Sequence, residues 1–108
     1  MDVETQKLLM TAQGLRQEAS GLATKITELE AEANEHQLVI DTLKDIDPER
    51  KCYRLIGDAL VEQTVKDVLP SVASNKEQIR GVIGRFSEEL KKKEDEADKI
   101  FKDVEKSQ

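Results

Sequence analysis

The side chains that could carry chemistry in this sequence are few. Cys52 is the only cysteine and His36 the only histidine. Nucleophilic and metal sites need several such groups held together, and neither residue has a second ligand or a base in sequence reach. No CxxC, HExxH or phosphate-loop motif is present. The sequence therefore predicts no catalytic residue, no metal site and no cofactor, and we expect the protein not to be an enzyme.

The remaining charged groups fit the exterior of helices. Glu88 and Lys92 are spaced as an i,i+4 ion pair. The run Lys91–Lys93 is followed at once by three acidic residues, and the formal net charge is −6. A nucleic-acid-binding protein is expected to carry a basic face, so we expect no nucleic-acid partner. One cysteine excludes an intrachain disulfide, and no apolar run is long enough for a membrane helix.

The first six residues, MDVETQ, are acidic and polar, unlike a secretory signal or a transit peptide. We therefore expect a cytoplasmic protein with no membrane partner.

The two ends of the chain carry few reactive side chains and instead show the apolar spacing of a coiled coil. Over residues 3–44 apolar positions alternate at spacings of three and four, which is the heptad signature. His36 falls on this line and is predicted to be a polar seam residue that helps fix the register, with Glu32 as a possible partner. One line is Leu8, Leu15, Leu22, Leu29, His36 and Leu43; the other is Ala12, Ala19, Ile26, Ala33 and Ile40.

The same pattern returns over residues 71–105. Lys76 and Lys93 interrupt it, but a lysine can bury its stem while its ammonium stays in water. Antiparallel pairing of the two helices would place Leu43 near Val72 and Leu8 near Val104. The two lines are Val72, Ile79, Phe86, Lys93 and Ile100, and Lys76, Ile83, Leu90, Ala97 and Val104.

The segment 45–70 between the helices reads as a β-hairpin. Asp47-Pro48 stops the first helix. Residues 51–56 and 59–64 form two short runs, and Gly57-Asp58 between them suits a type II′ turn. Such a turn pairs Ile56 with Ala59, Leu55 with Leu60 and Arg54 with Val61.

Both faces of this hairpin are partly apolar, one with Tyr53, Leu55 and Leu60 and the other with Cys52, Ile56, Ala59 and Val61. A lone two-stranded hairpin is marginal in water and its edges are open to pairing. We therefore expect the hairpin to join a larger sheet made with other subunits. After it, Thr64-Val-Lys-Asp67 is similar to a capping box that would start a short turn through Leu69, and Pro70 is expected to break or kink the chain.

The block Asn34–Pro70, NEHQLVIDTLKDIDPERKCYRLIGDALVEQTVKDVLP, with a heptad helix on either side, closely resembles a β-class prefoldin subunit. The resemblance covers essentially all of residues 1–108 as one domain. It implies a mainly α fold, in which a long antiparallel two-helix coiled coil is joined by a single β-hairpin that enters an inter-subunit β-barrel.

The resemblance also implies a function. Prefoldin is a hexamer of α-class and β-class subunits that captures unfolded polypeptides, such as nascent actin and tubulin, without ATP. It delivers them to the cytosolic group II chaperonin. An alternative that explains the helices but not the hairpin is a structural coiled-coil tether or adaptor.

Two sets of residues follow from this resemblance. The apolar residues at the ends of the helices are candidates for client binding: Leu8, Leu9, Met10, Ile100, Phe101 and Val104. Leu8, Ile100 and Val104 belong to the seam, so Leu9, Met10 and Phe101 are expected to be the accessible ones. The hairpin residues expected to build the barrel are Tyr53, Leu55, Ile56, Leu60 and Val61.

Overall fold

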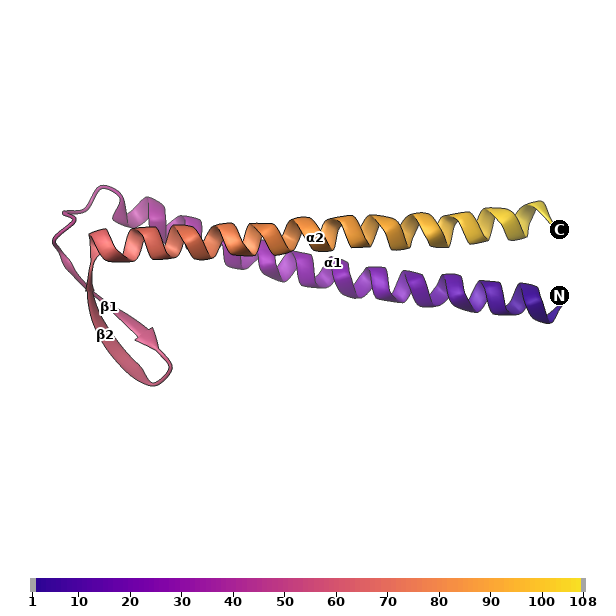
Figure 1. Cartoon of the computed structure of the whole chain (residues 1–108), viewed down its shortest axis with the longest axis horizontal. Helices are drawn as coiled ribbons and strands as arrows, with labels where there is room; N and C mark the ends of the chain where they lie inside the picture. Colours follow the sequence, from indigo (N-terminus) through magenta and orange to yellow (C-terminus); the bar gives the residue numbers. More distant parts are fainter. Residues whose placement is uncertain (1, 108) are drawn as a thin grey trace. The chain divides into compact units, whose positions relative to one another are not determined.

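The chain folds into two long helices with a β-hairpin between them. The computed structural model describes residues 2–107 and has the order α1 (Val3–Leu43), β1 (Lys51–Ile56), β2 (Ala59–Thr64) and α2 (Val65–Lys106) (Figure 1). The described residues form two compact units. We call residues 2–28 with 82–107 the terminal unit, and residues 29–81 the hairpin unit. The expected mainly α fold is confirmed.

Residues just outside α1 define both of its ends. The Thr5 N–H donates to Asp2 Oδ1 at 2.7 Å, an N-cap bond that lowers the pKa of Asp2. At the other end the Ile46 N–H donates to the Leu43 carbonyl at 3.0 Å. Asp47 then accepts the Glu49 N–H at 3.0 Å. The helix thus ends before Pro48, as its sequence predicts.

The start of α2 is capped largely by the linker backbone. The N–H groups of Val65 and Lys66 donate to the carbonyls of Arg50 and Pro48, each at 3.0 Å. Thr64 takes the N-cap position, but its hydroxyl donates to Asp67 Oδ2 at 3.0 Å, so this contact joins two side chains. A capping box would instead join each side chain to a backbone N–H.

The expected break at Pro70 is wrong, because α2 runs through it without interruption. A proline costs an interior helix the bond from its missing N–H, here to the Lys66 carbonyl. Burial of apolar side chains on either side, Val65, Val68 and Val72, holds the backbone in the helix despite that loss. Helical stability in proteins comes mainly from such packing.

Within the terminal unit, α1 and α2 run antiparallel and meet along small residues. Glu18 bonds Lys93 at 2.7 Å and Arg16 bonds Asp98 at 3.5 Å, so rising numbers on α1 meet falling numbers on α2. Lys93 keeps its stem in the seam while its ammonium reaches the carboxylate. The buried apolar side chains here are Ala12, Ala19, Ala97 and Val104.

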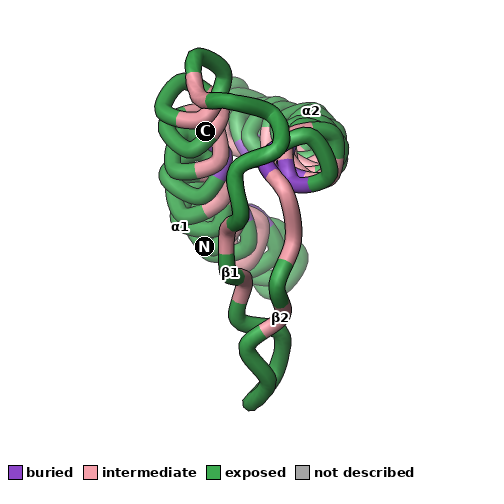
Figure 2. Tube along the Cα trace, turned by 90° about the vertical axis from the view of Figure 1, so that its left-hand side faces the viewer, coloured by how far each residue is buried: buried purple, intermediate pink, exposed green. Residues whose placement is uncertain are grey.

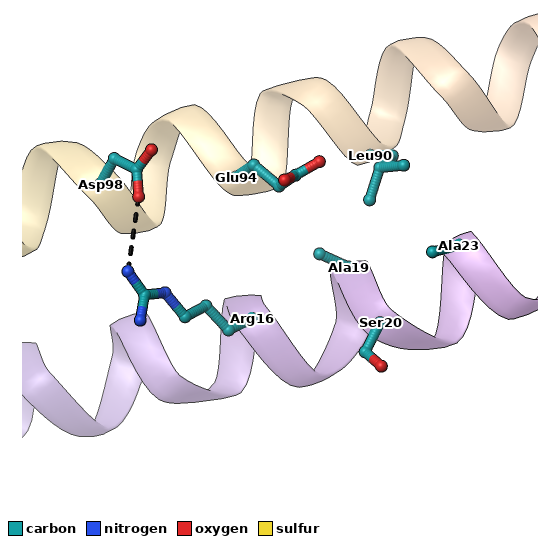
Figure 3. Close-up of a pocket in the computed structure, with 7 residues that line it drawn as sticks. All are labelled: Arg16, Ala19, Ser20, Ala23, Leu90, Glu94 and Asp98. Atoms are coloured by element: carbon teal, nitrogen blue, oxygen red, sulfur yellow. Dashed lines mark hydrogen bonds and ion pairs between the residues drawn. The ribbon is translucent and has the colours of Figure 1, made fainter.

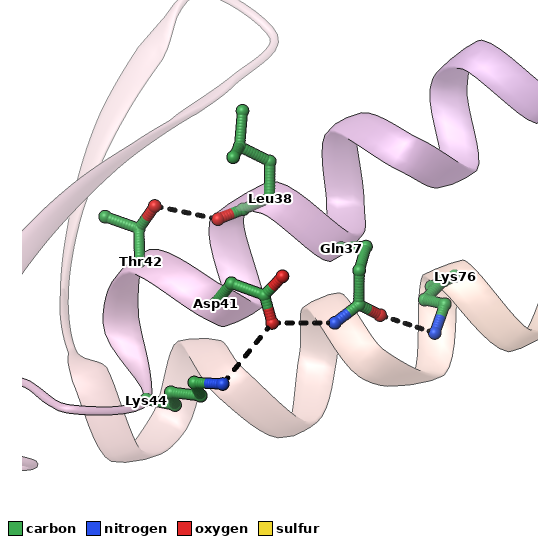
Figure 4. Close-up of polar contacts among 6 residues, drawn as sticks. All are labelled: Gln37, Leu38, Asp41, Thr42, Lys44 and Lys76. Atoms are coloured by element: carbon green, nitrogen blue, oxygen red, sulfur yellow. Dashed lines mark hydrogen bonds and ion pairs between the residues drawn. The ribbon is translucent and has the colours of Figure 1, made fainter.

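Within the hairpin unit the seam contains a polar network (Figure 4). Lys76 Nζ donates to Gln37 Oε1 at 2.6 Å, and Gln37 Nε2 donates to Asp41 Oδ1 at 2.9 Å. Lys44 lies 3.7 Å from the same carboxylate. The bond from Lys76 to Gln37 crosses between the helices, and a polar group at a seam favours the register in which its partner is opposite.

The seam between α1 and α2 differs from the predicted seam at Leu8. Leu8, expected in the seam, is 46% exposed, whereas Leu9 is half-buried. The two residues lie four and three positions before Ala12, so either can flank it. Leu9 shares a helix face with Arg16, seven residues on, and Arg16 bonds α2. That contact turns the Leu9 side of α1 toward α2 and leaves Leu8 outside.

Candidate functional site

The hairpin presents one of its two faces to solvent. Its register is the predicted one, with Ile56 opposite Ala59, and Gly57 has the positive φ of 60° that a type II′ turn needs. Residues opposite each other share a face, so Tyr53, Leu55 and Leu60 lie together. All three are 63–70% exposed, and Figure 2 shows the distal part of the hairpin almost wholly exposed.

The other face of the hairpin is turned toward its own chain. Arg54 Nη1 donates to Ser71 Oγ of α2 at 2.9 Å, and Cys52 and Val61 on this face are half-buried. Of the five residues predicted for assembly, four are therefore exposed, since Ile56 near the turn is exposed as well. Val61 is the exception, because it shares the inner face with Arg54.

An open groove of about 360 Å³ separates this inner face from the helices. His36 is half-buried beside it. Its Nδ1 lies 2.7 Å from the Glu32 carbonyl, so the ring donates to the backbone one turn back and not to the Glu32 carboxylate. The groove is lined mainly by apolar or half-buried residues of α1, β1 and α2: Glu35, His36, Val39, Leu43, Cys52, Tyr53, Arg54, Val68 and Val72.

The candidate client-binding residues all lie in the terminal unit, and their accessibility differs from the expectation. Met10 is 71% exposed, and Leu8 is also exposed. Leu9 and Phe101, expected to be accessible, are half-buried, and Ile100 is half-buried in the seam. Val104 is buried, as a seam residue should be.

Phe101 is half-buried partly because Arg16 covers its ring. The Arg16 guanidinium lies 4.2 Å from the ring centroid and 3.5 Å from Asp98 Oδ1. Beside this contact, Ala19, Ser20 and Ala23 face Leu90 across a groove of about 440 Å³ (Figure 3). This contact was not predicted from the sequence, although Arg16 and Leu9 are one heptad apart and so share a face.

Two other kinds of site, a metal site and a membrane-spanning helix, concern residues 2–107. In this range no three His, Cys, Asp or Glu side chains are grouped so that they could hold a metal ion. Neither α1 nor α2 contains a stretch apolar enough to span a lipid bilayer. What these residues do provide is exposed apolar surface on the hairpin and at the ends of the helices.

Comparison with known proteins shows which family has this sequence and architecture. The family model described as prefoldin subunit matches residues 6–108. Prefoldin subunit 2 of Rattus norvegicus is 53% identical over 91 residues, which are 84% of this chain and 59% of that protein. The same-named protein of Saccharomyces cerevisiae is 49% identical over 82 residues, 76% of this chain and 74% of the relative.

A solved structure shares the fold. The crystal structure of the prefoldin beta subunit from Thermococcus strain KS-1 has a TM-score of 0.91, covering 99% of this chain and 94% of that one, at 12% identity. The chain spans 59% of the length of the mammalian relatives it matches. The resemblance of the Asn34–Pro70 block is thus confirmed by the family model, by the relatives and by the fold, and the chain belongs to the prefoldin subunit family.

Proposed function

We propose that this chain is a subunit of a hexameric prefoldin in the cytoplasm, assembled with α-class and other β-class subunits. The complex would capture unfolded polypeptides, such as nascent actin and tubulin, without ATP and pass them to the group II chaperonin. Family membership supports this proposal. The observation that carries it is the hairpin, whose exposed apolar face and two open edges suit pairing with other subunits.

Assembly is tested at the exposed face. Leu55 and Leu60 lie opposite each other there, so the double variant Leu55→Asp, Leu60→Asp would place two charges in the inter-subunit sheet. Val61 is a poorer choice because it is half-buried within its own chain. Light scattering of the purified chain mixed with α-class and β-class prefoldin subunits should show a hexamer for the wild type and none for the double variant. A hexamer of normal mass that contains the double variant would refute the role of this face.

Client capture is assigned to the terminal unit. Met10 and Leu8 are exposed and would make the first contacts, with Leu9 and Phe101 becoming available as the helix ends fray. Met is flexible and suits contact with many sequences. Ile100 and Val104 would contribute only if the seam opens.

The test uses the assembled complex and an unfolded, reduced polypeptide as client. Leu8→Ser with Met10→Ser should weaken suppression of client aggregation while the mass of the hexamer stays unchanged. Full suppression by this variant would exclude these two residues as the client contact. The tether alternative predicts instead that the purified chain forms a parallel dimer and ignores other prefoldin subunits, which the same mass measurement detects.

A further inference from the structure

Two exposed apolar residues of α1 have no role in the coiled coil or in the hairpin. Leu38 is 66% exposed and Val39 is 40% exposed. Leu38 points away from α2, and the contact to α2 is made by its neighbour Gln37 (Figure 4). A single exposed leucine is ordinary, but these two adjoin further apolar surface in the same unit.

That adjoining surface is the groove beside β1. Val39 and Tyr53 both line it, and Leu43, Cys52 and Val68 supply further apolar lining. Tyr53 is also part of the exposed hairpin face. Apolar surface therefore continues from the hairpin face, across the groove, to Val39, and Leu38 is the exposed apolar residue next to Val39 in sequence.

The hairpin alone is too small to form a stable interface with another subunit. Strands β1 and β2 have six residues each, and one face is turned toward α2 through the bond from Arg54 to Ser71. A stable protein interface takes about 20–30 residues, or about 800 Å², from each partner. One face of this hairpin is well below that size, so a stable subunit contact must extend onto neighbouring elements.

We propose that the assembly surface reaches beyond the hairpin to Leu38 and Val39 of α1, and that the hairpin of a neighbouring prefoldin-family subunit covers it. The occupant follows from the position of β1. Three consecutive residues of β1, from Cys52 to Arg54, line the groove, and β1 has β2 on one side only. A strand added along the open edge of β1 lies beside the groove, where its side chains reach Val39. This inference rests on the proposed function.

The test is the variant Leu38→Glu in the full chain, mixed with the α-class and β-class prefoldin subunits. Leu38 is exposed in the single chain, so the change leaves its fold intact, but in the complex it would bury a charge without a partner. The protein concentration at half-assembly should rise at least tenfold by light scattering. The matched control is Val3→Glu, the same charge at an exposed apolar residue of α1 outside the candidate client-binding set, which should leave that concentration unchanged.

A second measurement does not depend on a destabilising variant. Leu38→Cys in a Cys52→Ser background should react with a maleimide at least tenfold more slowly in the complex than in the free chain. Val3→Cys in that background should react equally fast in both. Unchanged assembly by Leu38→Glu, or equal labelling of Leu38→Cys, would overturn the inference.

The outcome for the hairpin variant separates the inference from the function on which it rests. If Leu55→Asp, Leu60→Asp abolishes the hexamer and Leu38→Glu does not affect it, the subunit role stands and only the extension to α1 fails. If neither variant affects assembly, both the hairpin role and the extension fail.

Discussion

The guanidinium of Arg16 lies over the ring of Phe101, 4.2 Å from its centroid, and joins α1 to α2 in the terminal unit. The same guanidinium lies 3.5 Å from Asp98 Oδ1, three residues before Phe101 and so on the same face of α2. A cation over an aromatic face at an exposed site contributes about 0.5–1 kcal/mol. Arg16 therefore shields the ring of Phe101 only weakly, and Phe101 is the only aromatic residue among the candidate client-binding residues.

A double-mutant cycle with Arg16→Ala and Phe101→Leu measures this contact. We expect a coupling of about 0.5–1 kcal/mol in the free energy of unfolding in urea, because leucine keeps most of the apolar burial and loses the ring face. The control pair is Arg85→Ala with Phe101→Leu, since Arg85 is an exposed arginine of the same unit. Zero coupling for Arg16, or equal coupling for Arg85, would contradict the stacking.

Gly57 and Gly81 should respond in opposite directions to alanine. Gly57 has a φ of 60° in the hairpin turn, where a Cβ costs about 1–2 kcal/mol, so Gly57→Ala should lower the free energy of unfolding. Gly81 lies within α2, and a Cβ there would meet nothing within 4 Å. Gly81→Ala should therefore raise stability by up to about 1 kcal/mol through helix propensity. Thermal unfolding of both variants decides the signs, and a stabilising Gly57→Ala would argue against the turn.

Ala33 is fully buried in the hairpin unit, and its small size sets how closely the helices approach there. Ala33→Leu should overpack the seam and cost about 1–3 kcal/mol. Ala73 is an exposed alanine of α2 in the same unit, so Ala73→Leu is the matched control and should change stability by less than about 0.5 kcal/mol. Equal effects in urea unfolding would show that Ala33 does not lie in a close-packed seam.

Lys93 makes the coiled coil sensitive to high pH. The hydrogen bond that the Lys93 ammonium donates to Glu18 Oε2 raises the pKa of Lys93, against a smaller opposing effect of burial. A raised pKa in the folded state means that the contact stabilises the fold below the unfolded pKa of about 10.5 and that this stabilisation is lost as pH rises through the folded pKa.

Lys93→Met removes that titration while keeping an apolar stem. The difference in unfolding free energy between wild type and variant should therefore shift against the wild type as the pH rises above the unfolded pKa of about 10.5. Comparing the two proteins cancels the titration of the other lysines. A difference that stays constant over this range would show that the Lys93–Glu18 bond does not persist in solution.

Much of this architecture could be predicted from local chemistry. The heptad spacing over both helices, the stop at Asp47-Pro48 and the register across Gly57-Asp58 depend on residues near one another in the chain, and the structure agrees with each. The resemblance of the central block to prefoldin subunits also needed only the order of residues, because that block is a specific string and the heptads are not.

Other features depended on contacts between segments far apart in sequence. Heptads allow either Leu8 or Leu9 to flank Ala12, and the bonds of Arg16 across to α2 decide which one is buried. Proline at position 70 is a helix breaker by local rules, and burial of Val68 and Val72 overrides them.

The hairpin shows the same division between sequence and tertiary structure. Alternation along the strands determined which residues share a face, with Leu55 beside Leu60 and Arg54 beside Val61. Only the bond from Arg54 to Ser71 of α2 decided which face is turned inward. Alternation is a property of the strand itself, whereas the direction in which a face points depends on what the folded chain places against it.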